Sequence, residues 1–211
     1  MTVVPEGESI TGTDDQEELT GTGQNDTIQG GAGDDAISAG NGDERLRGGA
    51  GDDLLSGGLM YEVPQDQAAD ALDDFQSGLD VRFTPEFSSV SDDGASDTLV
   101  GGDGLDTLIA GDGDVLTGGG GSGNDFVTGY WAEGNTAAVV TDFDLDEDAL
   151  LYYYPEAEGA PELTVEIEDN GSGGQDSVLY ADGSAIMRIN GTGGTLSVDV
   201  HVRAVASFAE I

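Results

Sequence analysis

Length and charge restrict the class of this protein before any motif is considered. The chain has 211 residues, and its 44 acidic side chains face only five basic ones, for a formal net charge of -39. Nucleic acid and anionic membrane surfaces are therefore excluded as partners, whereas cations are favoured. The absence of cysteine excludes disulfides, thiolate zinc sites and cysteine catalysis.

Composition also predicts how the chain behaves without a ligand. Glycine occupies 36 positions, well above its usual share of about 7%, and this excess belongs to turns. The net charge opposes compaction, so we expect the metal-free chain to be expanded or partly disordered. No apolar run approaches the roughly 18 residues of a spanning helix. Met1–Gly7 shows no secretory leader pattern.

One nonapeptide dominates the N-terminal half. The segments 30–38 and 48–56 share the pattern Gly-Gly-x-Gly-x-Asp-x-apolar-x. The glycines allow a tight turn with positive φ and inward carbonyl groups, and the sixth-position Asp adds a carboxylate. Together these oxygens form the shell that Ca²⁺ prefers. The apolar eighth residue lies on a short strand and points into a narrow core, so two nonapeptides make one coil and same-side turns lie 18 residues apart.

These repeats resemble the RTX calcium-binding β-roll family. The resemblance covers roughly residues 12–58 and 92–205 and implies an all-β fold: a parallel β-roll with a C-terminal antiparallel β cap. It also implies several bound Ca²⁺ ions and export by a type I secretion apparatus that recognises an uncleaved C-terminal signal. The final segment 204–211, small and apolar, is compatible with such a signal.

The first block of repeats occupies residues 1–58. From Gly12 five nonapeptides follow without a gap, with acidic sixth positions and apolar eighth positions. The apolar positions are Leu19, Ile28, Ile37, Leu46 and Leu55. The first copy has Asp15 where glycine is expected, so we predict that it caps the roll.

An insertion over residues 59–91 interrupts the repeats. Ala68, Ala71, Leu72 and Phe75 have helical spacing, which predicts a short helix. The second block, residues 92–129, contains a full copy at 101–109, a copy at 110–116 that is one residue short and contains Asp114, and a copy at 120–128.

The region 130–211 loses the glycine repeat. Alternating patterns predict strands at 137–141, 150–154, 163–167, 177–180, 185–189 and 196–202. Asp182-Gly183 and Asn190-Gly191 are hairpin-turn signals. These features predict an antiparallel β cap together with the secretion-signal region.

The candidate metal ligands are the acidic residues and glycines of the turns. With same-side turns 18 residues apart, Asp35 is expected to stack on Asp53 and Asp26 on Glu44. Asp97–Asp114 and Asp106–Asp125 are further expected pairs, although their spacing slips to 17 and 19 residues. The full set is Asp26, Gly30, Gly31, Gly33, Asp35, Glu44, Gly48, Gly49, Gly51, Asp53, Asp97, Gly101, Gly102, Gly104, Asp106, Asp114, Gly121, Gly123 and Asp125. We expect about four to eight ions from the number of stackable turns.

Other chemistry has weaker signals. The run Asp142–Asp148 is either a further cation site or a solvated acidic turn; it is not an EF-hand, because Glu147 stands where glycine is needed. Tyr152–Tyr154 and Trp131 are packing residues or a carbohydrate platform. His201, the only histidine, leaves no His-Glu-x-x-His zinc site, and no serine lies in a nucleophile elbow.

The sequence therefore predicts a secreted, non-enzymatic, calcium-binding repeat protein whose roll folds on binding Ca²⁺ after export. No nucleic acid or membrane insertion is expected, and the oligomeric state stays open. Three alternatives remain: an accessory or targeting module of a secreted protease or polysaccharide-modifying enzyme, a cell-surface adhesin or ice-binding roll, and a pore-forming toxin. The last needs an apolar membrane domain and acylated lysines, which this chain lacks.

Overall fold

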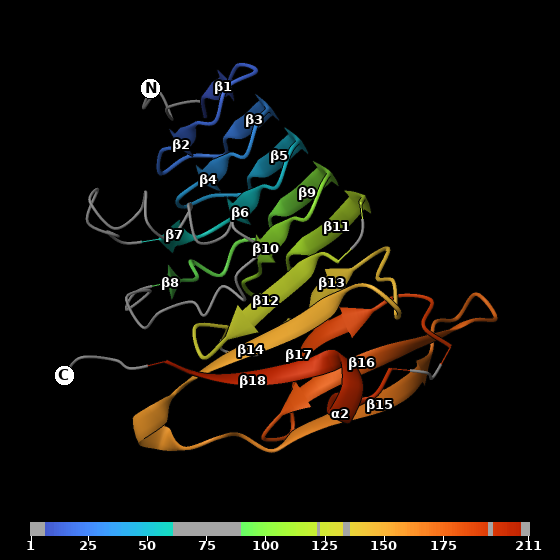
Figure 1. Cartoon of the computed structure of the whole chain (residues 1–211). Coiled ribbons are helices and arrows are strands. Elements are labelled where there is room, and N and C mark those ends of the chain that lie inside the picture. The colour runs from blue at the N-terminus through green and yellow to red at the C-terminus, as the bar shows by residue number, and fades with distance from the viewer. Residues whose placement is uncertain (1–6, 61–89, 122, 133–135, 194–195, 208–211) are drawn as a thin grey trace.

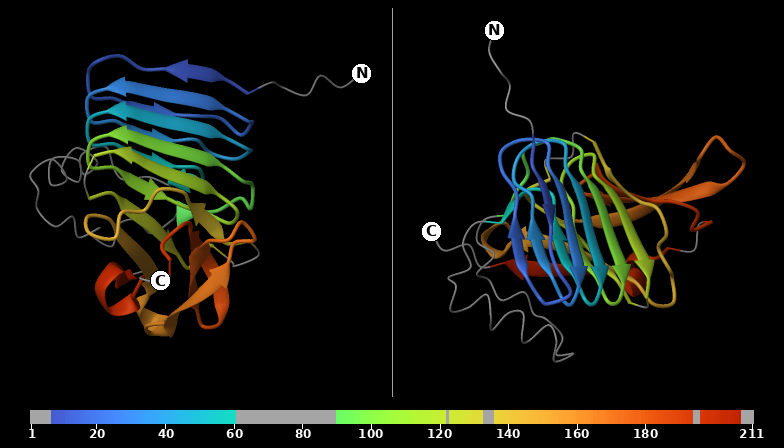
Figure 2. Two further views of the ribbon diagram at one scale, coloured as in Figure 1. Left: turned by 90° about the vertical axis from the view of Figure 1, so that its right-hand side faces the viewer. Right: turned by 90° about the horizontal axis from the view of Figure 1, so that it is seen from above.

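The computed structural model describes residues 7–60, 90–121, 123–132, 136–193 and 196–207 (Figure 1). Within them the chain is almost entirely β-structure. Two sheets run along the molecule and face each other across a common apolar core (Figure 2).

The larger sheet has nine strands. Their order is β1 (Ser9–Thr11), β3 (Thr27–Ala32), β5 (Arg45–Ala50), β9 (Thr98–Asp103), β11 (Val115–Gly120), β13 (Ala138–Val140), β17 (Ser184–Ile189), β16 (Gln175–Ala181) and β15 (Leu163–Asp169).

The second sheet has seven strands. Their order is β18 (Val202–Ser207), β14 (Ala149–Pro155), β12 (Asp125–Gly129), β10 (Thr107–Ile109), β6 (Leu54–Ser56), β4 (Ala36–Ser38) and β2 (Glu18–Thr20). A separate antiparallel pair, β7 (Leu59–Met60) and β8 (Val90–Ser91), joins the two ends of the inserted segment. A 3₁₀ turn, η1 (Glu156–Glu158), follows β14.

Strand pairing follows the 18-residue period. Thr27 of β3 lies beside Arg45 of β5, and Ala36 of β4 lies beside Leu54 of β6, both in parallel pairs. The chain alternates between the sheets, so each coil contributes one strand to each (Figure 2). The predicted parallel β-roll is confirmed.

The core between the sheets consists of the apolar eighth positions. Ile28, Leu46 and Leu99 line it from the larger sheet, and Ile37 and Leu55 line it from the smaller one, each at most 2% exposed. The pleat alternates side chains between the two faces of a strand, so one apolar residue per short strand is enough to fill this narrow interior. Leu19, in the first copy, is only partly buried at the open end of the roll.

A second apolar cluster lies on the outer face of the smaller sheet. Ile109 and Val127 are buried there together with Val90 from the returning end of the insertion. Trp131 packs on the same cluster and donates its indole N–H to the carbonyl of Ala110 at 2.9 Å. These contacts make Trp131 a packing residue.

The C-terminal region differs from the sequence prediction in one respect. Only β15, β16 and β17 are antiparallel to one another, whereas β13, β14 and β18 pair in parallel and continue the roll. The antiparallel cap is therefore smaller than residues 130–211. The Asp182-Gly183 hairpin is present between β16 and β17, and both residues have positive φ.

The segment 196–202 was expected as a strand, and this is wrong except at Val202, where β18 begins. Val198–His201 forms one helical turn, α2, before β18 begins. The amide of Ser197 donates to Nδ1 of His201 at 3.0 Å, and the amide of His201 donates to the Ser197 carbonyl at 2.9 Å. These two hydrogen bonds close the helical turn, and β18 then pairs in parallel with β14. The predicted helix of the insertion lies outside the described residues. Among the described residues, no helix is long and apolar enough to span a bilayer.

Candidate metal centre

The turns of the roll form two stacked columns, one at each edge of the sheets. We call side one the turns 12–17, 30–35, 48–53, 101–106 and 118–124, which lead from the larger sheet to the smaller. Side two comprises the turns 21–26, 39–44 and 109–114, together with a turn that begins at 57–58 and resumes at 92–97 after the insertion; these turns lead back. All predicted ligands except Asp125 belong to one of these columns.

Glycine is required on side one by backbone conformation and by close stacking. Gly49 has a φ of 137°, and a Cβ atom there would collide with the carbonyl oxygen of Gly31 in the turn above. A Cβ atom at Gly51 would likewise collide with the carbonyl oxygen of Gly33. The carbonyl groups of the second and fourth turn residues therefore point along the roll into the gap between turns. The equivalent positive-φ glycines of the other two turns are Gly31, Gly33, Gly102 and Gly104.

The sixth-position side chains of side one form a continuous hydrogen-bonded ladder. The amide of Asp35 donates to Oδ1 of Asp53 at 2.9 Å, and the amide of Asp53 donates to Oδ1 of Asp106 at 2.9 Å. Toward the N-terminal end, the amide of Glu17 donates to Oδ1 of Asp35 at 2.9 Å. Toward the C-terminal end, the amide of Asp106 donates to Oδ1 of Asn124 at 2.9 Å. The expected stack of Asp35 on Asp53 is present, and the insertion leaves it intact, since Asp53 and Asp106 lie 53 positions apart in sequence.

The second carboxylate oxygen has no partner in three of these residues. Oδ2 of Asp35, Asp53 and Asp106 is buried and accepts no hydrogen bond, although the three side chains are at most 1% exposed. Burial raises the pKa of all three, to about 7 for Asp53 and about 6 for Asp106. An unpaired buried carboxylate oxygen is costly, so this column requires a proton or a cation.

The turns of side two hold their carboxylates differently. The amide of Asp97 donates to Oδ1 of Asp114 at 2.9 Å, so this expected pair is present. Asp26 and Glu44 occupy consecutive turns, as the pairing of Thr27 with Arg45 requires. Both carboxylate oxygens of Glu44 are buried without a partner, and burial together with the neighbouring Asp97 raises the pKa of Glu44 to about 9.

Asp125 is not in the ladder, which corrects the expected pairing of Asp106 with Asp125. Thr107 pairs with Asp125 on adjacent strands, and the amide of Asp106 donates to Oδ1 of Asn124. Asn124 is thus the sixth-position residue, 3% exposed.

The shift arises in a turn that is one residue longer. Gly119 pairs with Gly102, which makes Gly118 the first turn residue. A Cβ at Gly121 would meet the carbonyl of Gly104, so Gly121 is in fourth position and Gly123 precedes the ladder residue. The four consecutive glycines 118–121 permit several registers, so the sequence signal was ambiguous.

The acidic run Asp142–Asp148 is a turn closed by main-chain donors. Asp148 accepts the amides of Asn124 and Asp144 at 2.8 Å each. Asp142 accepts the amides of Gly118 and Gly119 at 2.9 Å each. In the part of the chain that the structure describes, no group of three or more Asp, Glu or His side chains is arranged around a common metal position. The acidic run therefore caps the side-one column.

A metal in this roll must accordingly bind few carboxylates and many carbonyls. The gaps of side one that follow Asp35, Asp53 and Asp106 each offer one unpaired carboxylate oxygen and carbonyl groups from glycines. Only oxygen ligands are present, which suits Ca²⁺, a hard cation with about six to eight oxygen ligands, and does not suit zinc, which prefers nitrogen and sulfur.

The fold and these turns define the class: a parallel β-roll of nonapeptide coils whose stacked turns form oxygen-rich cation sites. The comparison with protein families then identifies the repeats. The model of the RTX calcium-binding nonapeptide repeat, present in four copies, matches residues 11–43, 38–59 and 92–122, so these segments of the chain are RTX calcium-binding repeats. A search of the curated proteins found no similar sequence.

Proposed function

We propose that this chain is a secreted, non-enzymatic RTX protein whose β-roll folds when it binds Ca²⁺ outside the cell. The observation that carries the proposal is the set of buried, unpaired Oδ2 atoms in consecutive stacked turns. Without a cation, the folded roll contains buried carboxylate oxygens that no hydrogen-bond donor or positive charge stabilises.

The residues that would hold the ion come from the turns. Asp35, Asp53 and Asp106 would supply the carboxylates, and turn glycines would supply carbonyl oxygens. Bound Ca²⁺ supplies positive charge that offsets the cost of burying carboxylates. The turns themselves orient the oxygens, because their glycines have a fixed positive φ and stack at a constant period.

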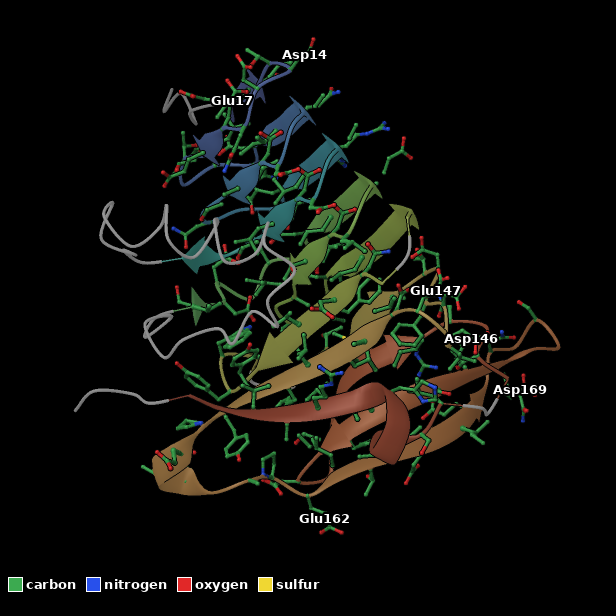
Figure 3. All side chains as sticks on the ribbon, in the orientation of Figure 1. Asp14, Glu17, Asp146, Glu147, Glu162 and Asp169 are labelled. Carbon is green, nitrogen blue, oxygen red and sulfur yellow. The ribbon has the colours of Figure 1, made fainter. Side chains whose placement is uncertain are left out.

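Long-range repulsion adds to the local need for a cation. The net charge is -39, and exposed carboxylates lie at both ends of the molecule: Asp14 at the N-terminal end and Asp146, Glu162 and Asp169 around the cap (Figure 3). Like charges destabilise a compact chain. Since a ligand that binds only the folded state stabilises that state, calcium binding is coupled to folding.

Export follows from the same coupling. A chain that stays unfolded where calcium is scarce is suited to passage through a type I secretion apparatus, and it would fold on meeting extracellular calcium. Extracellular calcium modules bind with dissociation constants of about 10⁻⁴ to 10⁻³ M. The lack of cysteine fits a chain that needs no oxidative folding step.

A calcium titration of the chelator-treated protein tests the proposal. Far-UV circular dichroism should show a cooperative transition from coil to β-structure, and an equal concentration of Mg²⁺ should not produce it. A spectrum that is already β-rich in chelator at neutral pH, and that calcium leaves unchanged, would contradict calcium-driven folding.

A further inference from the structure

The two sides of the roll differ in turn sequence. On side one, the consecutive turns 30–35, 48–53 and 101–106 all have the full Gly-Gly-x-Gly-x-Asp pattern. On side two no turn has it, and residues 59–91 are inserted between Gly58 and Asp92, inside the turn that ends at Asp97. Only side one can therefore build the same cation site repeatedly.

Three successive gaps of side one contain the same oxygen atoms. In the first, Oδ2 of Asp35 lies beside the α-carbon of Gly30, and the carbonyl of Gly48 faces the same point. The carbonyl of Gly31 points across this gap toward Gly49. In the second gap Oδ2 of Asp53 lies beside Gly48, and the carbonyl of Gly49 points toward Gly102. In the third gap Oδ2 of Asp106 and the carbonyl of Gly118 both lie beside Gly101.

The gap at the N-terminal end of side one is closed by the protein itself. Glu17 replaces aspartate there, and its Oε2 accepts the main-chain amide of Thr13 at 2.5 Å. The three open gaps thus correspond to the three unpaired Oδ2 atoms on this side.

Side two satisfies the second carboxylate oxygen of Asp26 and of Asp114 with N–H groups of the same turn. Oδ2 of Asp26 accepts the amide of Thr22 at 2.5 Å and its hydroxyl at 3.0 Å. Oδ2 of Asp114 accepts the amide of Gly111 at 2.7 Å. A carboxylate oxygen that already accepts a main-chain donor gains less from a cation than one with no partner.

Glu44 is the exception on side two. It lies in a turn with positive-φ glycines at Gly40 and Gly42, and its carboxylate has no hydrogen bond. The next turn toward the N-terminus has Thr22 and Gln24 at the corresponding positions. The next turn toward the C-terminus contains the insertion. The repeated cation site needs two matching turns, and neither neighbour of the Glu44 turn has glycines at the matching positions in an uninterrupted turn.

We propose that this roll binds Ca²⁺ along one side only, as a single file of three ions in the gaps that follow Asp35, Asp53 and Asp106. Side two binds none, because main-chain donors close Asp26 and Asp114 and its turns lack the repeated glycine pattern. This placement rests on the proposed calcium-binding function. It lowers the expected number of ions below the four to eight counted from all stackable turns.

Matched Asp→Asn variants on the two sides test the placement in the full chain. An asparagine keeps the Oδ1 acceptor of the ladder and replaces Oδ2 by an NH₂ group. Calcium stoichiometry is measured by equilibrium dialysis and isothermal titration calorimetry with CaCl₂. The parent chain should bind three ions, and Asp35→Asn, Asp53→Asn and Asp106→Asn should each bind one fewer. Asp26→Asn and Asp114→Asn should still bind three.

Stability without calcium gives a different signature for the two sides. At pH 5 in chelator, the side-one variants should be as stable as the parent, because Oδ2 of the replaced aspartate accepts no hydrogen bond that could be lost. The side-two variants should be less stable, because each loses an acceptor for a main-chain amide. This second readout does not depend on metal binding.

Each outcome has a distinct meaning. Six or more ions in the parent chain, or an equal loss of ions from variants on both sides, would overturn the one-sided placement. Anomalous diffraction from crystals grown with CaCl₂ locates the ions directly, so the test survives a variant that does not fold; an ion beside Asp26 or Asp114 would likewise overturn it. A parent chain that binds no calcium would instead contradict the proposed function.

Discussion

Replacing Gly49 by alanine should destabilise the roll more than replacing a glycine that is merely in a turn. Gly49 has a φ of 137°, and a Cβ there would collide with the main chain of Gly31. Gly171, in the exposed hairpin between β15 and β16, has a φ of 72° and no heavy atom within 4 Å of its added Cβ. Comparing Gly49→Ala with Gly171→Ala therefore separates the cost of backbone strain from the cost of a collision with the stacked turn.

The magnitude follows from the two contributions. A left-handed backbone costs a non-glycine residue about 1–2 kcal/mol, which is the full effect expected at Gly171. At Gly49 the added methyl group also displaces a neighbouring coil, and overpacking adds about 1–3 kcal/mol. For a chain of this size each kcal/mol lowers Tm by about 2–4 °C.

The assay is differential scanning calorimetry of both variants and the parent in saturating CaCl₂. Gly49→Ala should show the larger fall in Tm and a weaker calcium affinity, whereas Gly171→Ala should leave calcium affinity unchanged. Equal falls in Tm would refute the inference that the turns stack closely enough to require glycine.

Three further predictions concern charge and packing. The raised pKa values of Glu44, about 9, and of Asp53 and Asp114, about 7, mean that the folded state binds protons more tightly than the unfolded chain, whose values are 4.5 for Glu and 3.8 for Asp. Their contribution to stability is present below about pH 4 and is lost as pH rises through 7 to 9, so circular dichroism in chelator should show β-structure at pH 5 that disappears by pH 9. Asn124→Asp places a charge next to the buried Asp106 ladder, so it should destabilise the calcium-free chain and strengthen calcium binding in a titration. Phe126→Ala empties a fully buried position and should cost about 3–5 kcal/mol in the calcium-loaded state, measured by chemical unfolding.

Controls accompany these three predictions. A pH profile in chelator that is flat between pH 5 and 9 would contradict the burial of unpaired carboxylates. Asn124→Ser, which adds no charge, should not strengthen calcium binding. Leu105→Ala, at a side chain 48% exposed, should change stability by less than about 0.5 kcal/mol, and a loss equal to that of Phe126→Ala would argue against the assigned core.

The nine-residue period alone determined the architecture of the roll. Short strands with one apolar residue each can bury it only by stacking, so positions such as Ile28 and Leu46 had to align at twice the repeat length, as they do. The same period placed Asp35 over Asp53, because a ladder residue has a fixed place in each turn. Asp97 still stacks on Asp114 although the copy between them is one residue short. Where the nine-residue register is unbroken, the sequence pattern is therefore enough to predict which residues stack on each other.

Where the sequence allows two registers or two local conformations equally well, only the tertiary structure decided between them. The run of glycines at 118–121 fits more than one register, and strand pairing selected Asn124 over Asp125 for the ladder. The segment at Val198 alternates like a strand, yet one helical turn brings β18 beside β14.

The difference between the two sides of the roll is the clearest case. Asp26 and Asp35 occupy the same position of the repeat, but Thr22 donates to one carboxylate and no group donates to Oδ2 of the other. Which carboxylates remain open to a cation is determined by hydrogen bonds within and between turns, and the nonapeptide pattern does not encode those bonds.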